Sequence, residues 1–193
     1  MLFMKNDIYY VLERLANVLR QEVRHIGAEQ GLLPVQQEAL YYLSVCNRYS
    51  DTAAAVTDYL GLTKGTVSQT LKVLEGKGLI VKEKDTHDKR VTHLVLTQQG
   101  KTYLEKTSPP ANFLGALDEL QQTDIAQLHG NLHALLKAYQ NKRNRTLFGV
   151  CKSCKYNLSE VDGFRCGLTQ QSLSSHDVSL ICREYLEKPL SAK

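Results

Sequence analysis

Apolar side chains recur at helical spacing in the N-terminal part of the chain. Between residues 7 and 29 they are separated by three, four or seven positions, the period of an amphipathic helix, and Asn6 or Asp7 can cap its start. Pro34 suits the first turn of a second helix, because its missing N–H is not needed there. The apolar face of that helix comprises Val35, Ala39, Leu43 and Cys46.

A polar break at residues 47–51 precedes two short helices. The first is expected over 52–60, with an inward side made of Ala53, Val56, Tyr59 and Leu60. Gly61 and Leu62 form a turn, and Thr63 is a good N-cap for a helix that runs to about Lys77. The buried stripe of this second helix comprises Val67, Leu71 and Leu74.

A β-hairpin and further helices follow. Strands are predicted over 79–84 and 91–96, joined by the polar turn 85–90. Thr97 caps a helix over 98–106, a proline pair breaks it, and another helix spans about 111–120. Thr123 is expected to cap a long helix to about Arg143. Its apolar seam can be core or a face offered to a second subunit, and comprises Ile125, Leu128, Leu132, Leu135 and Tyr139.

Composition changes this picture little. The chain has 193 residues, 42% of them hydrophobic, and a net charge of +4, which permits nucleic-acid binding without requiring it. No run of 18 apolar residues exists and no secretory signal is visible, so we expect no membrane contact and a cytoplasmic location. The six histidines, His93 among them, are interpreted as isolated surface residues.

The order helix, glycine turn, capped helix and hairpin predicts a winged helix-turn-helix. The capped helix offers side chains that can reach base edges in the major groove of double-stranded DNA, and the hairpin tip offers cations for the phosphate backbone or the minor groove. The candidate DNA-contacting residues are Thr63, Lys64, Thr66, Ser68, Gln69, Lys72, Lys89 and Arg90.

Residues 33–100 resemble the core of the MarR family of bacterial regulators. The similarity lies in the stretches 60–68, 74–80, 85–90 and 96–100. It implies that Asp88 braces Arg90 at the wing tip, and that the long first and last helices form a homodimer. Two positions depart from the usual pattern: Gln69 stands where many relatives have a basic residue, and the pair Pro109-Pro110 interrupts a helix that is often long.

Four of the five cysteines gather near the C-terminus as Cys151-x2-Cys154-x11-Cys166-x15-Cys182. In a reducing compartment this grouping predicts one metal centre with four thiolate ligands. An Fe–S cluster is preferred, because only one CxxC pair is present; structural zinc is the alternative, followed by disulfide chemistry. Cys182 is expected on a closing helix over 178–187. Cys46 is interpreted as a core residue.

The sequence therefore predicts a mainly α protein with a small β-hairpin wing, long dimerisation helices and a C-terminal cysteine-rich metal segment. The expected parts are a winged-helix and dimerisation domain over 1–144 and a metal segment over 145–193. The predicted function is a homodimeric regulator, a repressor at an inverted-repeat operator, whose metal centre senses redox or iron status. Two alternatives remain: a regulator responding to a small molecule, with purely structural zinc, and a thiol oxidoreductase using Cys151 and Cys154. No other catalytic constellation emerges, so an enzyme is not expected.

Overall fold

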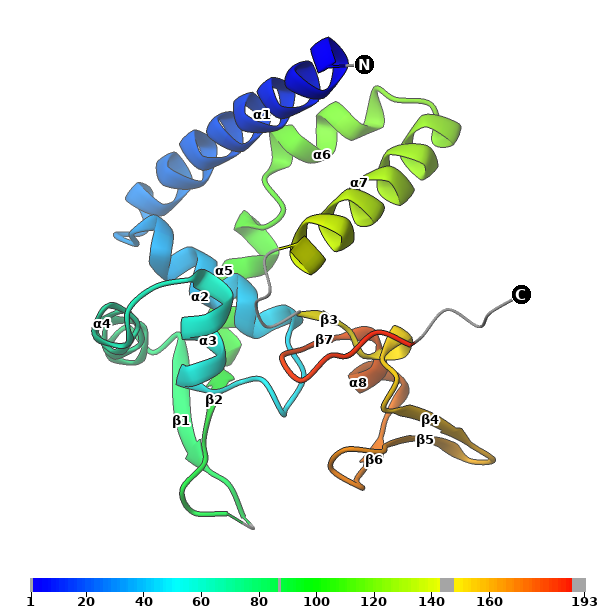
Figure 1. Ribbon diagram of the computed structural model, residues 1–193. Helices are drawn as coiled ribbons and strands as arrows, with labels where there is room; N and C mark the ends of the chain where they lie inside the picture. Colours follow the sequence, from blue (N-terminus) through cyan, green and yellow to red (C-terminus); the bar gives the residue numbers. More distant parts are fainter. Residues whose placement is uncertain (1, 87, 143–147, 189–193) are drawn as a thin grey trace.

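The structure is a computed structural model that describes residues 2–86, 88–142 and 148–188. The described chain is mainly helical, with small antiparallel sheets (Figure 1). Its helices are α1 (Leu2–Glu29), α2 (Pro34–Val45), α3 (Ala53–Leu60), α4 (Lys64–Gly76), α5 (Gln98–Thr107), α6 (Ala111–Asp118), α7 (Gln122–Lys142) and α8 (Ser175–Ser179). A short 3-10 turn, η1, covers Cys151–Ser153.

The strands form three sheets within the described residues. The wing pairs β1 (Ile80–Lys84) with β2 (Thr92–Leu96). A second sheet pairs β3 (Gly149–Val150) with β7 (Ile181–Cys182). The third has the order β4 (Asn157–Glu160), β5 (Gly163–Cys166) and β6 (Ser172–Leu173). The first sheet belongs to the DNA-binding half of the prediction, and the other two build the C-terminal segment.

Hydroxyl caps fix the starts of the central helices. The side chains of Thr52, Thr63 and Thr97 each accept a hydrogen bond from a backbone N–H in the first turn of α3, α4 and α5. Gly61 adopts φ 67°, a left-handed conformation that glycine takes without steric cost, and this sharp turn sets α4 against α3. The local signals for the helix-turn-helix therefore act as the sequence predicted.

One core joins α2, α3, α4, the wing and α5. The stripe predicted for α4 is buried in it, as are Leu40, Tyr42 and Ile80. In α3, however, the buried residues are Ala55 and Val56, while Ala53 is exposed and Tyr59 is 40% exposed. The predicted inward side of that helix was thus wrong at two positions. The residues of the described α4 that are buried are Val67, Thr70, Leu71 and Leu74.

The helices α1, α6 and α7 lie together at the opposite end of the molecule from the wing (Figure 1). Thr123 does not cap α7, which already begins at Gln122; the backbone of Gln121 accepts from Asp124 and Ile125 instead. The expected end of that helix at Arg143 lies outside the described residues. In the described part of the chain, no helix is both long and apolar enough to cross a membrane.

The expected helix over 178–187 is wrong. The helix α8 ends at Ser179, and Ile181 and Cys182 form a strand that pairs with β3, Val150 opposite Ile181. The apolar spacing of Val178, Ile181 and Tyr185 is that of a helix. In the extended form, however, the backbone of Ile181 and Cys182 can pair with β3, about 30 residues earlier in the sequence. Cys182 is therefore carried by a strand.

The C-terminal segment packs directly on the winged-helix core. Phe148 and Ile181 are partly buried against it. The Phe148 ring meets Tyr42 and Tyr59 edge-on, with ring centroids 5.9 and 5.1 Å apart. The second, smaller core of the described chain, around Cys151, Leu173 and Val178, includes Tyr49 from the loop after α2. Residues 148–188 are thus in contact with the winged-helix part through both cores.

Candidate nucleic-acid interface and cysteine cluster

The helix α4 presents a polar face to solvent. The Thr63 hydroxyl accepts from the backbone N–H of Thr66 at 3.2 Å, and the two hydroxyl groups are 2.9 Å apart, so the start of the helix is fixed. Opposite the buried stripe, the exposed face carries the side chains that were predicted to reach bases. These exposed residues are Lys64, Thr66, Ser68, Gln69 and Lys72.

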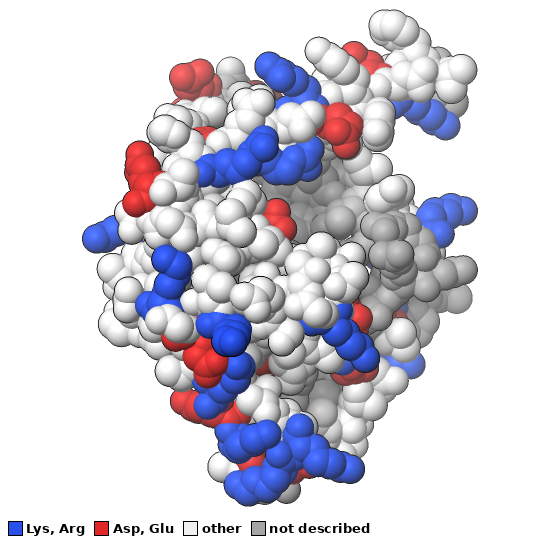
Figure 2. Space-filling model, turned by 90° about the vertical axis from the view of Figure 1, so that its left-hand side faces the viewer, with Lys and Arg blue, Asp and Glu red and all other residues white. Residues whose placement is uncertain are grey.

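A groove of about 360 Å³ lies between α4 and the wing. Lys64 and Ser68 line it from α4, and Lys82 and Thr92 line it from the two wing strands. Figure 2 looks at the side of the molecule that carries α4, and Lys and Arg side chains gather at its lower end, where the wing lies. The helix and the cationic wing therefore border one continuous surface.

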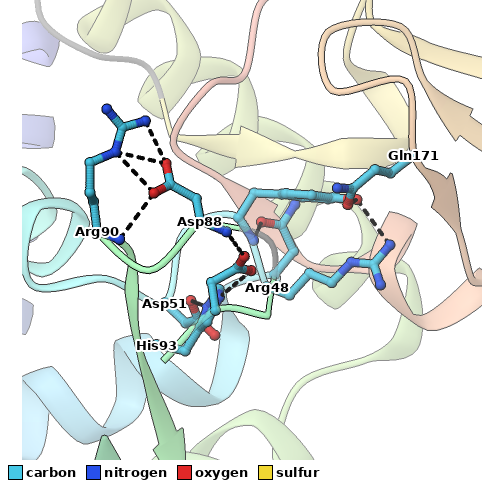
Figure 3. Close-up of polar contacts among 9 residues, drawn as sticks. Arg48, Asp51, Asp88, Arg90, His93 and Gln171 are labelled. Carbon is cyan, nitrogen blue, oxygen red and sulfur yellow. Dashed lines mark hydrogen bonds and ion pairs between the residues drawn. The ribbon is translucent and has the colours of Figure 1, made fainter. Parts of the chain in front are cut away.

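The wing tip holds a fixed arginine. Asp88 Oδ1 accepts from the backbone N–H of Arg90 at 3.0 Å and from its Nε at 2.9 Å, while Oδ2 accepts from Nη2 at 2.8 Å (Figure 3). These hydrogen bonds from Arg90 lower the pKa of Asp88 to about 2. The Arg90 side chain remains 90% exposed, and Lys89 beside it is exposed as well. The guanidinium is thus held in one direction and left open to a ligand.

The base of the wing is anchored by His93, which the sequence interpretation had treated as an isolated surface residue. Its Nδ1 lies 2.6 Å from Asp51 Oδ1 and its Nε2 lies 3.1 Å from Asp85 Oδ2 (Figure 3). Burial alone would lower the pKa of His93, but the hydrogen bonds and charges of the two carboxylates outweigh it and raise the pKa. That interpretation was wrong because Asp51 is 42 residues away, and no local pattern reveals such a pairing.

The four C-terminal cysteines line one small cavity. It measures about 20 Å³, and Cys151, Cys154, Cys166 and Cys182 all contribute to its wall. Cys151 begins η1 and Cys154 follows it, Cys166 ends β5, and Cys182 ends β7. Other wall residues come from the loop after α2, namely Asn47 and Tyr49. The fold therefore brings together thiols that are up to 31 positions apart in sequence, as Cys151 and Cys182 are.

Hydrogen-bond donors point at these sulfur atoms. The backbone N–H of Leu186 donates to Cys154 Sγ at 3.4 Å, and Asn157 Nδ2 donates to Cys151 Sγ at 3.7 Å. Asn47, only 1% exposed, has a buried Nδ2 with no well-formed hydrogen bond, and its side chain interacts with the Cys182 thiol, which lowers the pKa of that thiol. An unpaired buried donor is costly unless it finds an acceptor, and a thiolate sulfur in this cavity is one. These donors therefore favour the thiolate form of the sulfurs.

Burial raises the pKa of Cys151 and of Cys182, and it outweighs the hydrogen bonds from Asn157 to Cys151 and from Asn47 to Cys182, which lower these pKa values. A bound cation would instead lower the pKa of these thiols, because it favours the deprotonated sulfurs. As the side chains lie, however, no three His, Cys, Asp or Glu residues among the described ranges are grouped closely enough to hold a metal ion. Four thiols are the donor type that zinc and Fe–S clusters take, but these sulfurs would have to turn inward to surround an ion.

Cys46 is separate from this set. It is buried in the winged-helix core, and burial is the main reason that its pKa is raised to about 12. It does not belong to the cavity wall formed by the other four. This placement agrees with its interpretation as a core residue.

Comparison with known proteins concerns the winged-helix part. Residues 30–91 match the sequence profile of the MarR family. The chain is 32% identical over 92 residues to the organic hydroperoxide resistance transcriptional regulator of Bacillus subtilis. That alignment covers 47% of this chain and 62% of the relative, so less than two thirds of the relative's length is matched.

Solved structures extend the likeness to the fold. The MepR–DNA complex of S. aureus superposes with a TM-score of 0.54 at 25% identity, covering 67% of this chain and 96% of that one. CouR from Rhodococcus jostii RHA1, bound to p-coumaroyl-CoA, gives a TM-score of 0.55 at 18% identity, covering 68% and 92%. The winged-helix part of this chain is therefore similar to the MarR family in sequence and has the MarR fold.

Proposed function

We propose that this protein is a MarR-type DNA-binding transcription regulator, not an enzyme, that contacts double-stranded DNA with α4 and the wing. The observation that carries the proposal is the shared surface of a capped helix with an exposed polar face and a wing tip where Asp88 orients an exposed Arg90. The sequence similarity to a regulator and the fold of DNA-bound MepR support it. Selection of duplexes from a random pool by the purified protein tests it, and recovery of no sequence above background would reject it.

The regulator acts as a homodimer at an inverted repeat. This part of the proposal rests on apolar side chains of α1 and α7 that a single chain leaves exposed, among them Ile8, Leu15, Leu128, Leu132 and Leu135, each 40% exposed or more. Burying such surface against a second copy is favourable, and a two-fold dimer places its recognition helices about 34 Å apart. Repression is the proposed direction of regulation, because a dimer seated on an operator obstructs polymerase.

The four C-terminal cysteines are proposed to bind one metal centre per chain. The shared cavity, the donors aimed at sulfur and the buried Asn47 amide support this assignment. Both an Fe–S cluster and zinc take four thiolates. The cluster remains the preferred occupant because only one CxxC pair is present, and zinc is the alternative. Such a centre would supply either an oxidisable, iron-dependent signal or a structural staple. Protein purified without oxygen distinguishes them: visible colour with iron and sulfide indicates a cluster, while colourless protein with one zinc indicates a staple.

A small-molecule effector is the second candidate, and a pocket favours it. A cavity of about 520 Å³ is lined from α1, α2, α3 and α5 by residues that include Val23, Glu38, Tyr41, Tyr59 and Tyr103. Burial raises the pKa of Glu38 at its edge. In this version the metal is inert zinc and an aromatic ligand releases DNA. A regulator whose DNA affinity responds to aromatic acids but not to metal removal would favour it.

The thiol oxidoreductase is the weakest alternative. A redox CxxC needs an accessible thiolate of low pKa, whereas Cys151 and Cys154 are both buried and the pKa of Cys151 is raised. Turnover of a dithiol substrate by the purified protein, abolished in Cys151→Ser, would be needed to restore it.

A further inference from the structure

The two sequence neighbours of Cys182, Ile181 and Arg183, are hydrogen-bonded to the α2–α3 loop, residues 46–52. The backbone N–H of Asn47 donates to the Ile181 carbonyl at 2.9 Å. The backbone N–H of Arg183 donates to Ser50 Oγ at 2.8 Å, and its Nη2 lies 2.6 Å from Asp58 Oδ2 on α3. Cys182 therefore stands between two residues that both contact the α2–α3 loop, and one of them, Arg183, also contacts α3.

A second set of contacts ties the same loop to the rest of the cysteine segment. Arg48 Nη2 donates to the Ser172 carbonyl at 2.6 Å, and the Tyr49 hydroxyl donates to Gln171 Oε1 at 2.9 Å. Arg48 and Gln171 lie close together in Figure 3. Together with the Asn47 and Tyr49 side chains on the cavity wall, these contacts make the loop one side of the thiol site.

The loop also holds the wing. Asp51 directly follows Ser50, and its carbonyl accepts from the backbone N–H of Leu94 at 2.7 Å. Its carboxylate binds His93, which in turn reaches Asp85 at the start of the wing turn. Asp85 Oδ1 accepts from the backbone N–H of Asp88, the residue that orients Arg90. A connected series of hydrogen bonds thus runs from the flanks of Cys182 to the wing tip.

We infer that the occupancy of the four-cysteine site sets the position of the wing of the same subunit through the α2–α3 loop. Asn47 and Ser50 are positioning residues: Asn47 donates its side-chain N–H to a thiolate when metal is bound, and Ser50 holds the Arg183 backbone. With metal bound, Ile181–Arg183 is pinned, the loop is fixed and Arg90 is held for DNA. Without metal, residues 181–183 become mobile, and the contacts of the loop with the base of the wing weaken. The inference rests on the proposed DNA-binding and metal-binding functions.

A different route would pass through the dimerisation helices. Glu187 forms an ion pair with Lys137 on α7, and its backbone pairs with Cys154. This contact is the rival connection between the cysteine segment and the DNA-binding geometry. It predicts that the Lys137 side chain, and not the loop, carries the signal.

The test compares DNA affinity with and without metal in matched variants of the full chain. Ser50→Ala combined with Asp58→Asn removes the side-chain partners of Arg183 on the loop and on α3, with no substitution in residues 148–188. Glu160→Gln is the control, because it makes the same one-unit change in charge as Asp58→Asn and breaks an ion pair with Arg165 inside the segment. Metal is quantified as purified without oxygen and after a chelator, and affinity is measured on a duplex selected by the parent protein.

In the parent and in Glu160→Gln, we expect metal removal to weaken DNA binding by about 5- to 150-fold, the usual range of allosteric coupling. In the double variant, metal content should equal that of the parent while this ratio falls close to one. Hydrogen exchange supplies a second readout: in the parent only, metal removal should speed exchange in residues 47–51 and 92–94. If the double variant folds poorly, Asp58→Asn alone should give a ratio between those of the parent and the double variant.

The inference is overturned if the double variant keeps the parent's ratio, and the rival route is supported if Lys137→Gln abolishes it. Unchanged or stronger DNA binding by metal-free parent protein also overturns the inference while leaving the regulator intact. A parent protein that binds no DNA, or purifies without any metal, contradicts the proposed function itself, so the two failures are distinguishable.

Discussion

The imidazole of His93 on β2 lies 2.6 Å from the carboxylate of Asp51, which belongs to the loop before α3. This contact joins the wing to the helix-turn-helix by a side-chain pair that is 21% and 16% exposed. The buried Ile80 and Leu94 anchor the wing in the core, and this contact adds a polar attachment to the loop before α3.

The pKa of His93 gives a pH dependence with a definite sign. Asp51 and Asp85 outweigh burial and raise the pKa above its ordinary value near 6.5. The protonated ring therefore stabilises the folded protein fully below about pH 6.5, and this stabilisation is lost as the pH rises through the folded pKa. Urea unfolding between about pH 5 and 8 should show the parent losing its advantage over His93→Gln toward the alkaline end. A difference independent of pH would contradict the pairing.

Arg90→Ala and Lys72→Ala should each weaken DNA binding, because each removes a cation from the surface shared by α4 and the wing. For Arg90, loss of one phosphate contact should lower the slope of log affinity against log salt by about one unit. Polarisation titrations at several salt concentrations measure both effects. Lys155→Ala, an exposed lysine in the cysteine segment, is the control for charge. A combined Lys72 and Arg90 variant that binds as the parent does would remove the basis for the proposed interface.

Asp88→Asn should weaken DNA binding less than Arg90→Ala does. The arginine stays in place but loses the carboxylate that orients it through three side-chain hydrogen bonds. Because the pKa of Asp88 is lowered to about 2, the brace is fully charged at any pH suited to DNA titration. The effect of the substitution should therefore be the same at pH 6 as at pH 8, and an effect confined to one end of that range would speak against the brace.

Leu132→Glu should produce monomeric or insoluble protein. Leu132 is 40% exposed on α7 within the apolar seam, and a carboxylate buried between subunits carries a large desolvation cost. Light scattering at micromolar concentration measures the mass. Val161→Glu is the matched control, since Val161 is fully exposed at the β4–β5 turn and should tolerate the charge. A parent protein that is itself monomeric would refute the dimer.

Serine at any one of Cys151, Cys154, Cys166 or Cys182 should abolish tight metal binding, because three thiolates leave an open site. Cys46→Ser should leave the metal content unchanged, since that thiol packs in the winged-helix core. Elemental analysis of protein prepared without oxygen gives the ratio per chain. Equal metal content in Cys166→Ser and the parent would contradict a four-thiolate centre.

The winged-helix part was predictable because its signals are local. Thr63 and Thr97 cap the helices that follow them, Gly61 makes the turn, and the spacing of Val67, Leu71 and Leu74 identifies the buried side of α4. Each of these depends on residues within about two helical turns. The sequence similarity to a known family also predicted the order of the helices and strands.

The remaining features depend on distant partners, which no periodicity reveals. Ile181 is extended because it pairs with Val150 and Asn47, although its spacing from Val178 resembles a helix. His93 has its role only because Asp51 reaches it across the fold. The cysteine spacing predicted a common site, whereas the position of that site against the α2–α3 loop came only from the structure.

The packing of Phe148 has a consequence for any attempt to dissect the protein. Its ring lies edge-on to both Tyr42 and Tyr59, and Ile181 lies against the same core. A chain cut after α7 would retain the helix-turn-helix, the wing and the long helices. It would, however, expose the rings of Tyr42 and Tyr59 on which Phe148 packs. Residues 148–188 therefore complete the core of the winged-helix part, and removing them should lower its stability as well as delete the cysteines.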